Sequence, residues 1–160
     1  VKFDHDFIGR AALEKMAPGP HRRKVTLALD DEDVSRVWSA MLSKGDKPKF
    51  MDFPSAVYSM HPYDRVTHDG RTVGVSTWIG YSFNEGKMLT LAMVDAEHAE
   101  PGAELNLVWG EENGGTRKPT VERHVQTELK AIVSPVPYAE VARKIYADGG
   151  WRAHQEEAVA

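Results

Sequence analysis

The sequence contains no cysteine, and this absence removes several kinds of chemistry at once. It excludes a disulfide framework, a thiolate zinc site, an iron–sulfur cluster and a cysteine nucleophile. An excess of positive charge is also lacking, because 20 basic side chains stand against 24 acidic ones and the formal net charge is −4. We therefore expect no nucleic-acid partner, since such binding depends on neutralising phosphates.

Long apolar runs are missing as well. No stretch approaches the roughly 18 apolar residues needed to span a bilayer, and no signal peptide opens the chain. We expect a soluble, cytoplasmic protein with no membrane partner. The 7 histidines are scattered without a closely spaced ligand pair, so we also expect no metal site. The 160 residues suit one domain with a single core.

The first segment with a clear pattern is residues 6–16, where the spacing predicts a short helix. Asp6 is the expected cap, and Ile8, Ala12 and Met16 share one face at four-residue intervals. The Pro-Gly-Pro sequence that follows ends this helix.

Alternation of apolar and polar residues predicts strands through most of the chain. Asp69-Gly70 is a strong hairpin signal, because both residues tolerate the positive φ of a type I′ turn. The longest alternation covers residues 121–133, where we expect a bend or bulge and inward-facing Val125 and Leu129. The predicted strands are residues 23–29, 65–68, 71–75, 87–94, 105–109 and 121–133.

Two more segments have helical spacing. Apolar residues at positions 34, 37, 38 and 41 predict an amphipathic helix over 34–42, and the acidic run 30–33 suits its N-terminus. Residues 138–147 return to helical spacing, with Val141, Ala142 and Ile145 on one side, before a polar, frayed tail.

Together these elements predict a mainly β protein with flanking helices. We expect an antiparallel β-barrel of about six strands, Greek-key or jelly-roll-like, with short N- and C-terminal helices. The expected parts are a linker helix at 1–22, the barrel at 23–137 with a helical insertion near 32–43, and a C-terminal helix and tail at 138–160.

Residues 76–85 collect an indole, a phenol, hydroxyls, an amide and a carboxylate around Gly80. Such a mixture can form the edge of a ligand site, with rings for stacking and polar groups for orientation. The alternative is that Trp78 and Tyr81 fill the mouth of the barrel and the other residues form a connection.

The order of several motifs resembles the C-terminal part of the glycine-cleavage T-protein (aminomethyltransferase) family. Residues 6–13 (DFIGRAAL) are similar to the segment that joins the folate-binding core to the final barrel in that family. Residues 69–77 (DGRTVGVST) and 80–82 (GYS) resemble its hairpin, and 101–105 (PGAEL) resemble the start of its next strand.

Other details resemble one branch of the family, the tetrahydrofolate-dependent O-demethylases of vanillate and syringate type. These are residues 2–10, 49–52, 108–111 and 134–138. Ordinary aminomethyltransferases tend to have Thr-Ser-Gly-Gly and then Ser-Pro at the hairpin exit, where this chain has residues 78–81 (WIGY) and then 84–85 (NE). The difference favours a methyl or methylene donor other than glycine.

The resemblance implies transfer of a one-carbon unit to tetrahydrofolate. It also implies that folate and a small-molecule methyl donor bind mainly in a region N-terminal to these residues, and the valine at position 1 leads us to expect such a region. We assign no catalytic residue and name Trp78, Tyr81 and Tyr138 as cofactor contacts. The chain is then an inactive part of a methyltransferase; a free-standing, non-catalytic binding or assembly module is the alternative. The oligomeric state stays open.

Overall fold

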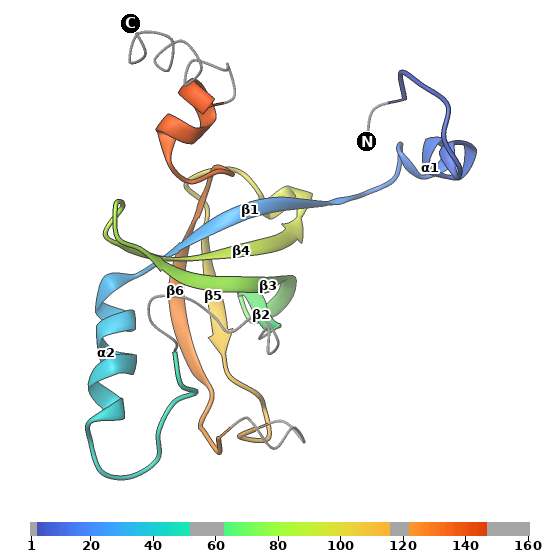
Figure 1. The fold of residues 1–160 in the computed structure, drawn as a ribbon. Helices are drawn as coiled ribbons and strands as arrows, with labels where there is room; N and C mark the ends of the chain where they lie inside the picture. The colour runs from blue at the N-terminus through green and yellow to red at the C-terminus, as the bar shows by residue number, and fades with distance from the viewer. Residues whose placement is uncertain (1–2, 52–62, 116–121, 147–160) are drawn as a thin grey trace, which may run out of the picture.

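The computed structural model describes residues 3–51, 63–115 and 122–146, and within these its six antiparallel strands close into a barrel (Figure 1). The strands follow the order β1-β4-β3-β2-β5-β6 around the barrel. The predicted fold class, a mainly β antiparallel barrel with flanking helices, is confirmed. The strands are β1 Arg22–Leu29, β2 Asp64–His68, β3 Arg71–Ser82, β4 Lys87–Asp95, β5 Glu104–Trp109 and β6 Thr127–Ser134.

The connections have Greek-key character. β2, β3 and β4 are antiparallel neighbours, whereas a long connection carrying helix α2 (Asp31–Met41) leads from β1 to β2, and β1 pairs with β4. The predicted hairpin between β2 and β3 is confirmed. Asp69 and Gly70 have φ of 48° and 73°, the positive values that a type I′ turn requires.

Alternating side chains fill the barrel interior. Leu27, Val66, Leu107 and Leu129 are each 0% exposed, and they come from four different strands. In β4 the alternation is complete, because every second residue is buried. Burial of this apolar surface supplies the main stabilising free energy of the barrel.

The last strand is shorter than its alternation predicts. β6 begins at Thr127, and Val125 forms an isolated parallel bridge with Pro48 instead of pairing with β5. Its backbone N–H donates to the Lys47 carbonyl at 2.8 Å. Val125 is therefore 43% exposed, and the prediction that it faces the core is wrong, whereas inward-facing Leu129 is confirmed.

Helix α2 confirms the prediction of an amphipathic helix after the acidic run. The Asp30 side chain caps it by accepting from the backbone N–H groups of Glu32 and Asp33 at 3.1 and 3.0 Å. Val37 is buried, and Val34 packs against the barrel core.

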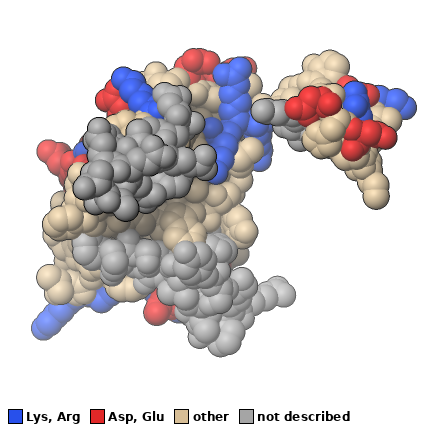
Figure 2. Space-filling model, turned by 45° about the horizontal axis from the view of Figure 1, so that its top comes forward, with Lys and Arg blue, Asp and Glu red and all other residues tan. Residues whose placement is uncertain are grey.

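Helix α1 begins later than predicted. It covers Arg10–Met16 with Gly9 at the N-cap, so Asp6 does not cap it; the Asp6 carboxylate accepts instead from the adjacent N–H of Phe7. None of its described residues is buried, and the preceding Ile8 is fully exposed. The segment projects from the barrel as an arm, which Figures 1 and 2 show standing apart.

Two short helical turns complete the described chain, the 3-10 turn η2 (Ala96–His98) and the π-helical turn η3 (Ala142–Tyr146). η3 lies within the predicted C-terminal helix, but Val141 and Ile145 are 48% and 44% exposed. The predicted tail lies outside the described residues. No helix in the described part of the chain is long and apolar enough to cross a membrane.

Candidate functional site

The three residues that the sequence singles out, Trp78, Tyr81 and Tyr138, line one pocket of about 360 Å³. We call it the aromatic pocket. It lies over the adjacent strands β1, β4 and β3, at the segment that follows β6. No charged side chain is among the described residues that line it, which are Thr26, Trp78, Gly80, Tyr81, Ser82, Leu89, Thr90, Leu91, Pro137 and Tyr138.

An irregularity in β3 turns Trp78 toward this pocket. Ser76 pairs with Ala92, and after a register shift Trp78 pairs with Leu91. In a regular strand Trp78 would share the inward face of Ser76, two residues before it. The extra residue at Thr77 reverses the alternation, so that Ile79 is buried and Trp78 lies on the outer side.

Tyr138 reaches the same pocket from the side of β1 that pairs with β6. It follows β6 after a cis peptide bond between Val136 and Pro137. The Arg143 guanidinium in η3 donates to the Pro137 carbonyl at 2.7 Å and also to the Tyr138 carbonyl. These bonds fix the short segment that carries the phenol ring.

Among the polar pocket residues that sequence reasoning missed is Thr26, in the middle of β1. The residue is 3% exposed, and its Oγ1 has no hydrogen-bond partner within the described structure. A threonine between two buried apolar residues, Val25 and Leu27, is the only signal that the sequence offers.

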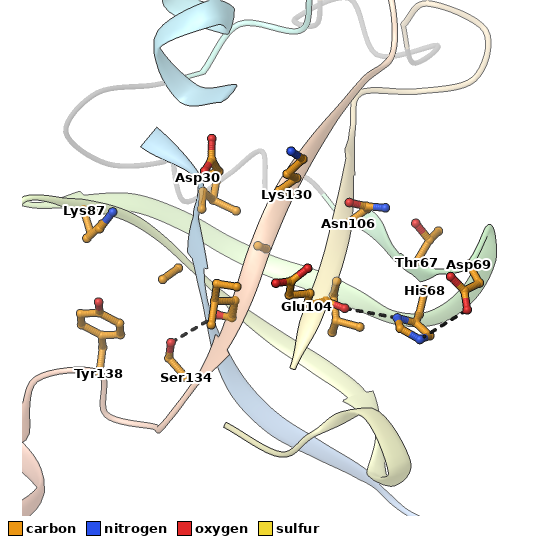
Figure 3. A pocket seen from close by; sticks show the side chains of 15 residues that line it. Asp30, Thr67, His68, Asp69, Lys87, Glu104, Asn106, Lys130, Ser134 and Tyr138 are labelled. Atoms are coloured by element: carbon orange, nitrogen blue, oxygen red, sulfur yellow. Dashed lines mark hydrogen bonds and ion pairs between the residues drawn. The ribbon is translucent and has the colours of Figure 1, made fainter. Parts of the chain in front are cut away.

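A second, larger pocket of about 680 Å³ adjoins the first, because Tyr138 lines both. Figure 3 shows this charged hollow, with Tyr138 and Lys87 at one end and His68 and Asp69 at the other. Lys130 and Asn106 project side by side from β6 and β5. Acidic and basic groups are mixed in it. Because its lining residues come from five strands that are distant in the sequence, no local sequence pattern predicts it.

A buried polar cluster braces the barrel near the end of β5. Lys49 Nζ lies 3.0 Å from both carboxylate oxygens of Asp64 and 4.5 Å from the centre of the Trp109 ring. Trp109 Nε1 donates to the Lys49 carbonyl at 2.8 Å, and the Gly110 N–H donates to Asp64 at 2.9 Å. Each partner is hydrogen-bonded, so this cluster stabilises the fold and leaves no group free to bind a ligand.

His124 is a buried histidine whose ring is held by backbone groups. His124 is 7% exposed, its Nε2 accepts from the Glu111 N–H at 2.8 Å, and its Nδ1 lies 2.8 Å from the Glu122 carbonyl oxygen. Across the described ranges, no three His, Cys, Asp or Glu side chains are grouped as a metal site. The aromatic pocket, by contrast, can hold a flat ring, because Trp78 and Tyr138 in its lining present aromatic faces.

Comparison with known proteins adds to this geometry. Residues 51–114 match the family described as the glycine cleavage T-protein C-terminal barrel domain. The chain is 68% identical over 152 residues to a syringate O-demethylase of Sphingobium sp. (strain NBRC 103272 / SYK-6). The aligned region covers 95% of this chain and 33% of that protein. The chain is also 31% identical over 153 residues to a sesamin methylene transferase of Sinomonas sp. (strain No.22), covering 89% of this chain and 32% of that protein. The chain thus spans about a third of the length of these curated relatives.

Proposed function

This chain belongs to the family of glycine cleavage T-protein C-terminal barrel domains, and from that membership we propose that it serves as the C-terminal barrel of a tetrahydrofolate-dependent one-carbon transferase. The proposed reaction is O-demethylation of a methoxylated aromatic acid. The observation that carries this proposal is the 68% identity to a syringate O-demethylase over 95% of the chain.

The second relative supports the reaction class. One name describes loss of a methyl group from syringate, and the other describes transfer of a methylene group from sesamin. Both reactions move a single carbon. The identity of the donor for this chain is proposed from the higher similarity to the first relative.

In this proposal the barrel contributes a wall and no catalytic group. Folate and the methyl donor bind mainly in a region that corresponds to the other two thirds of the relatives. Trp78 and Tyr138 supply aromatic faces for an adjacent part of the cofactor, and stacking on such faces is favourable for flat rings. Tyr81 lines the same pocket and also packs against the barrel core. The pocket has no charged residue among its described lining, which suits an uncharged part of the ligand.

A domain exchange tests the proposal. This chain replaces the matching third of the syringate O-demethylase, and demethylation of syringate is measured with tetrahydrofolate as acceptor. We expect the exchanged enzyme to be active and the isolated chain to show no turnover. Turnover by the isolated chain would contradict the proposal that the reaction depends on another region.

Matched variants of the exchanged enzyme test the aromatic wall. Trp78→Phe keeps a ring in the pocket, whereas Trp78→Ala removes it. We expect the alanine variant alone to raise the KM for tetrahydrofolate. A folded but inactive exchanged enzyme would instead favour the alternative of a non-catalytic binding or assembly module.

A further inference from the structure

The Thr26 hydroxyl is a buried polar group without a partner. The residue is 3% exposed, and Oγ1 makes no hydrogen bond to any part of the chain that the structure describes. Two other buried hydroxyls of the barrel are paired: Ser76 and Thr90 contact each other at 2.6 Å, and Thr90 also donates to the Trp78 carbonyl. An unpaired buried hydroxyl has lost its water without gaining a replacement, so it destabilises the free protein.

The register places this hydroxyl on the barrel wall that faces the aromatic pocket. Thr26 lies opposite Leu91 of β4 and Ser134 of β6, and its neighbours along β1, Val25 and Leu27, are buried in the core. Leu91 in turn lies opposite Trp78. Thr26 therefore belongs to the floor of the pocket, and Tyr138 belongs to the same lining.

The chemistry of the lining defines what this pocket can hold. It offers the aromatic side chains of Trp78 and Tyr138, a volume of about 360 Å³ and, within the described lining, no charged group to balance a buried charge. A threonine hydroxyl can donate one hydrogen bond and accept others. An uncharged flat ring with a hydrogen-bonding substituent meets all of these conditions, whereas an ionised group would be buried without a counter-ion.

We propose that Thr26 is the polar anchor of a ring-binding subsite that the barrel contains within itself. The ligand class is an uncharged aromatic or heteroaromatic ring, stacked against the pocket's aromatic side chains, with one polar substituent hydrogen-bonded to the Thr26 hydroxyl. This inference deepens the proposed function and relies on it only for the kind of molecule that supplies the ring, a folate or a methoxylated arene.

Reaching the ligand requires little rearrangement. No hydrogen bond holds the hydroxyl in its present rotamer, so rotation about χ1 to another staggered position breaks none. The free protein carries the cost of the unpaired group, and binding removes it. Affinity for the ring and stability of the free chain should therefore respond to the hydroxyl in opposite directions.

The test uses the 160-residue chain and two uncharged probes. One is 6-methylpterin, which represents the folate ring, and the other is syringamide, which represents a methoxylated arene. Binding is measured by titration calorimetry, and thermal unfolding is measured without a ligand. Thr26→Val removes the hydroxyl at nearly constant volume, Thr26→Ser keeps it, and Thr67→Val alters a buried threonine outside the pocket as a matched control.

We expect at least one probe to bind, and the probe that binds identifies the source of the ring. Thr26→Val should weaken that binding about fivefold, the loss of one neutral hydrogen bond, and raise the Tm of the free chain. Thr26→Ser and Thr67→Val should bind as the parent does. Absence of binding by both probes, unchanged affinity in Thr26→Val or a lowered Tm in that variant would each overturn the inference.

The result of this binding test can be distinguished from the result of the domain exchange. An active exchanged enzyme together with Thr26-independent binding would overturn this inference and support the proposed function. An inactive exchanged enzyme together with Thr26-dependent binding would do the reverse.

Discussion

At the scale of single residues, the stability of the barrel depends on the buried ion pair between Lys49 and Asp64. Their side chains are 12% and 2% exposed, and Asp64 also accepts from the Gly110 N–H. Asp64→Asn leaves the Lys49 charge buried without its counter-ion. We expect a loss of about 3–5 kcal/mol in the free energy of unfolding, measured by urea denaturation.

The matched control for this variant is Asp95→Asn. Asp95 pairs with Arg22 at 3.0 Å, but both side chains are more than 40% exposed, at 42% and 48%. Solvent screens this pair, so its loss should cost about 1 kcal/mol or less. An equal loss in the free energy of unfolding in the two variants would contradict the prediction that burial makes the Lys49–Asp64 pair more stabilising.

Two residues of one alternating pattern should respond differently to truncation. Leu129 is 0% exposed inside the barrel, and Leu129→Ala should cost about 2–5 kcal/mol in the free energy of unfolding. Val125, four residues earlier, is 43% exposed, and Val125→Ala should cost less than roughly 0.5 kcal/mol. The same denaturation measurement checks both. A large cost at Val125 would mean that β6 extends further than its ladder with β5.

At the scale of elements, helices α1 and α2 differ in how they begin. Asp30 caps α2 with two hydrogen bonds, whereas Asp6 lies four residues before α1 and accepts from the next N–H, that of Phe7. Asp30→Ala should therefore destabilise the protein by about 1 kcal/mol, and Asp6→Ala should have almost no effect. Thermal unfolding of the pair tests this. A loss at Asp6 as large as at Asp30 would contradict the observed start of α1.

The elements that the sequence predicts well are those whose signal is local. Alternation and the Asp69-Gly70 turn depend on neighbouring residues, and both predictions are confirmed. The end of a pattern depends on distant partners. The predicted alternation covers residues 121–133, but the ladder with β5 ends at Thr127, and Val125 pairs with Pro48 instead.

The same limit applies to the aromatic pocket. Trp78 and Tyr81 are close in sequence, so one local segment predicts both as site residues. Tyr138 is predicted only by the family resemblance. Thr26 became part of the site only through the pairing of β1 with β4, which no local pattern reveals. The register shift at Thr77, which turns Trp78 outward, is likewise set by the pairing of β3 with β4.

At the scale of the whole molecule, the N-terminal arm and the barrel differ in what holds them. The arm, residues 3–20 including α1, has no buried residue among those described, and Figure 2 shows it lying apart from the barrel. The barrel core begins with β1, where Val25 is 4% exposed. Its stability should therefore be independent of the arm, as expected for a linker outside the folding unit.

Deleting residues 1–19 tests this division while leaving β1 whole. The deletion removes one exposed contact of His21, whose Nε2 lies 3.1 Å from the Ala17 carbonyl, and no residue of the core. We expect the free energy of unfolding to change by less than about 0.5 kcal/mol, the range for changes that touch no buried contact. The measurement is urea denaturation followed by tryptophan fluorescence, because Trp109 is buried in the barrel. A loss of about 2 kcal/mol or more would place the arm within the folding unit and move the domain boundary to the start of α1.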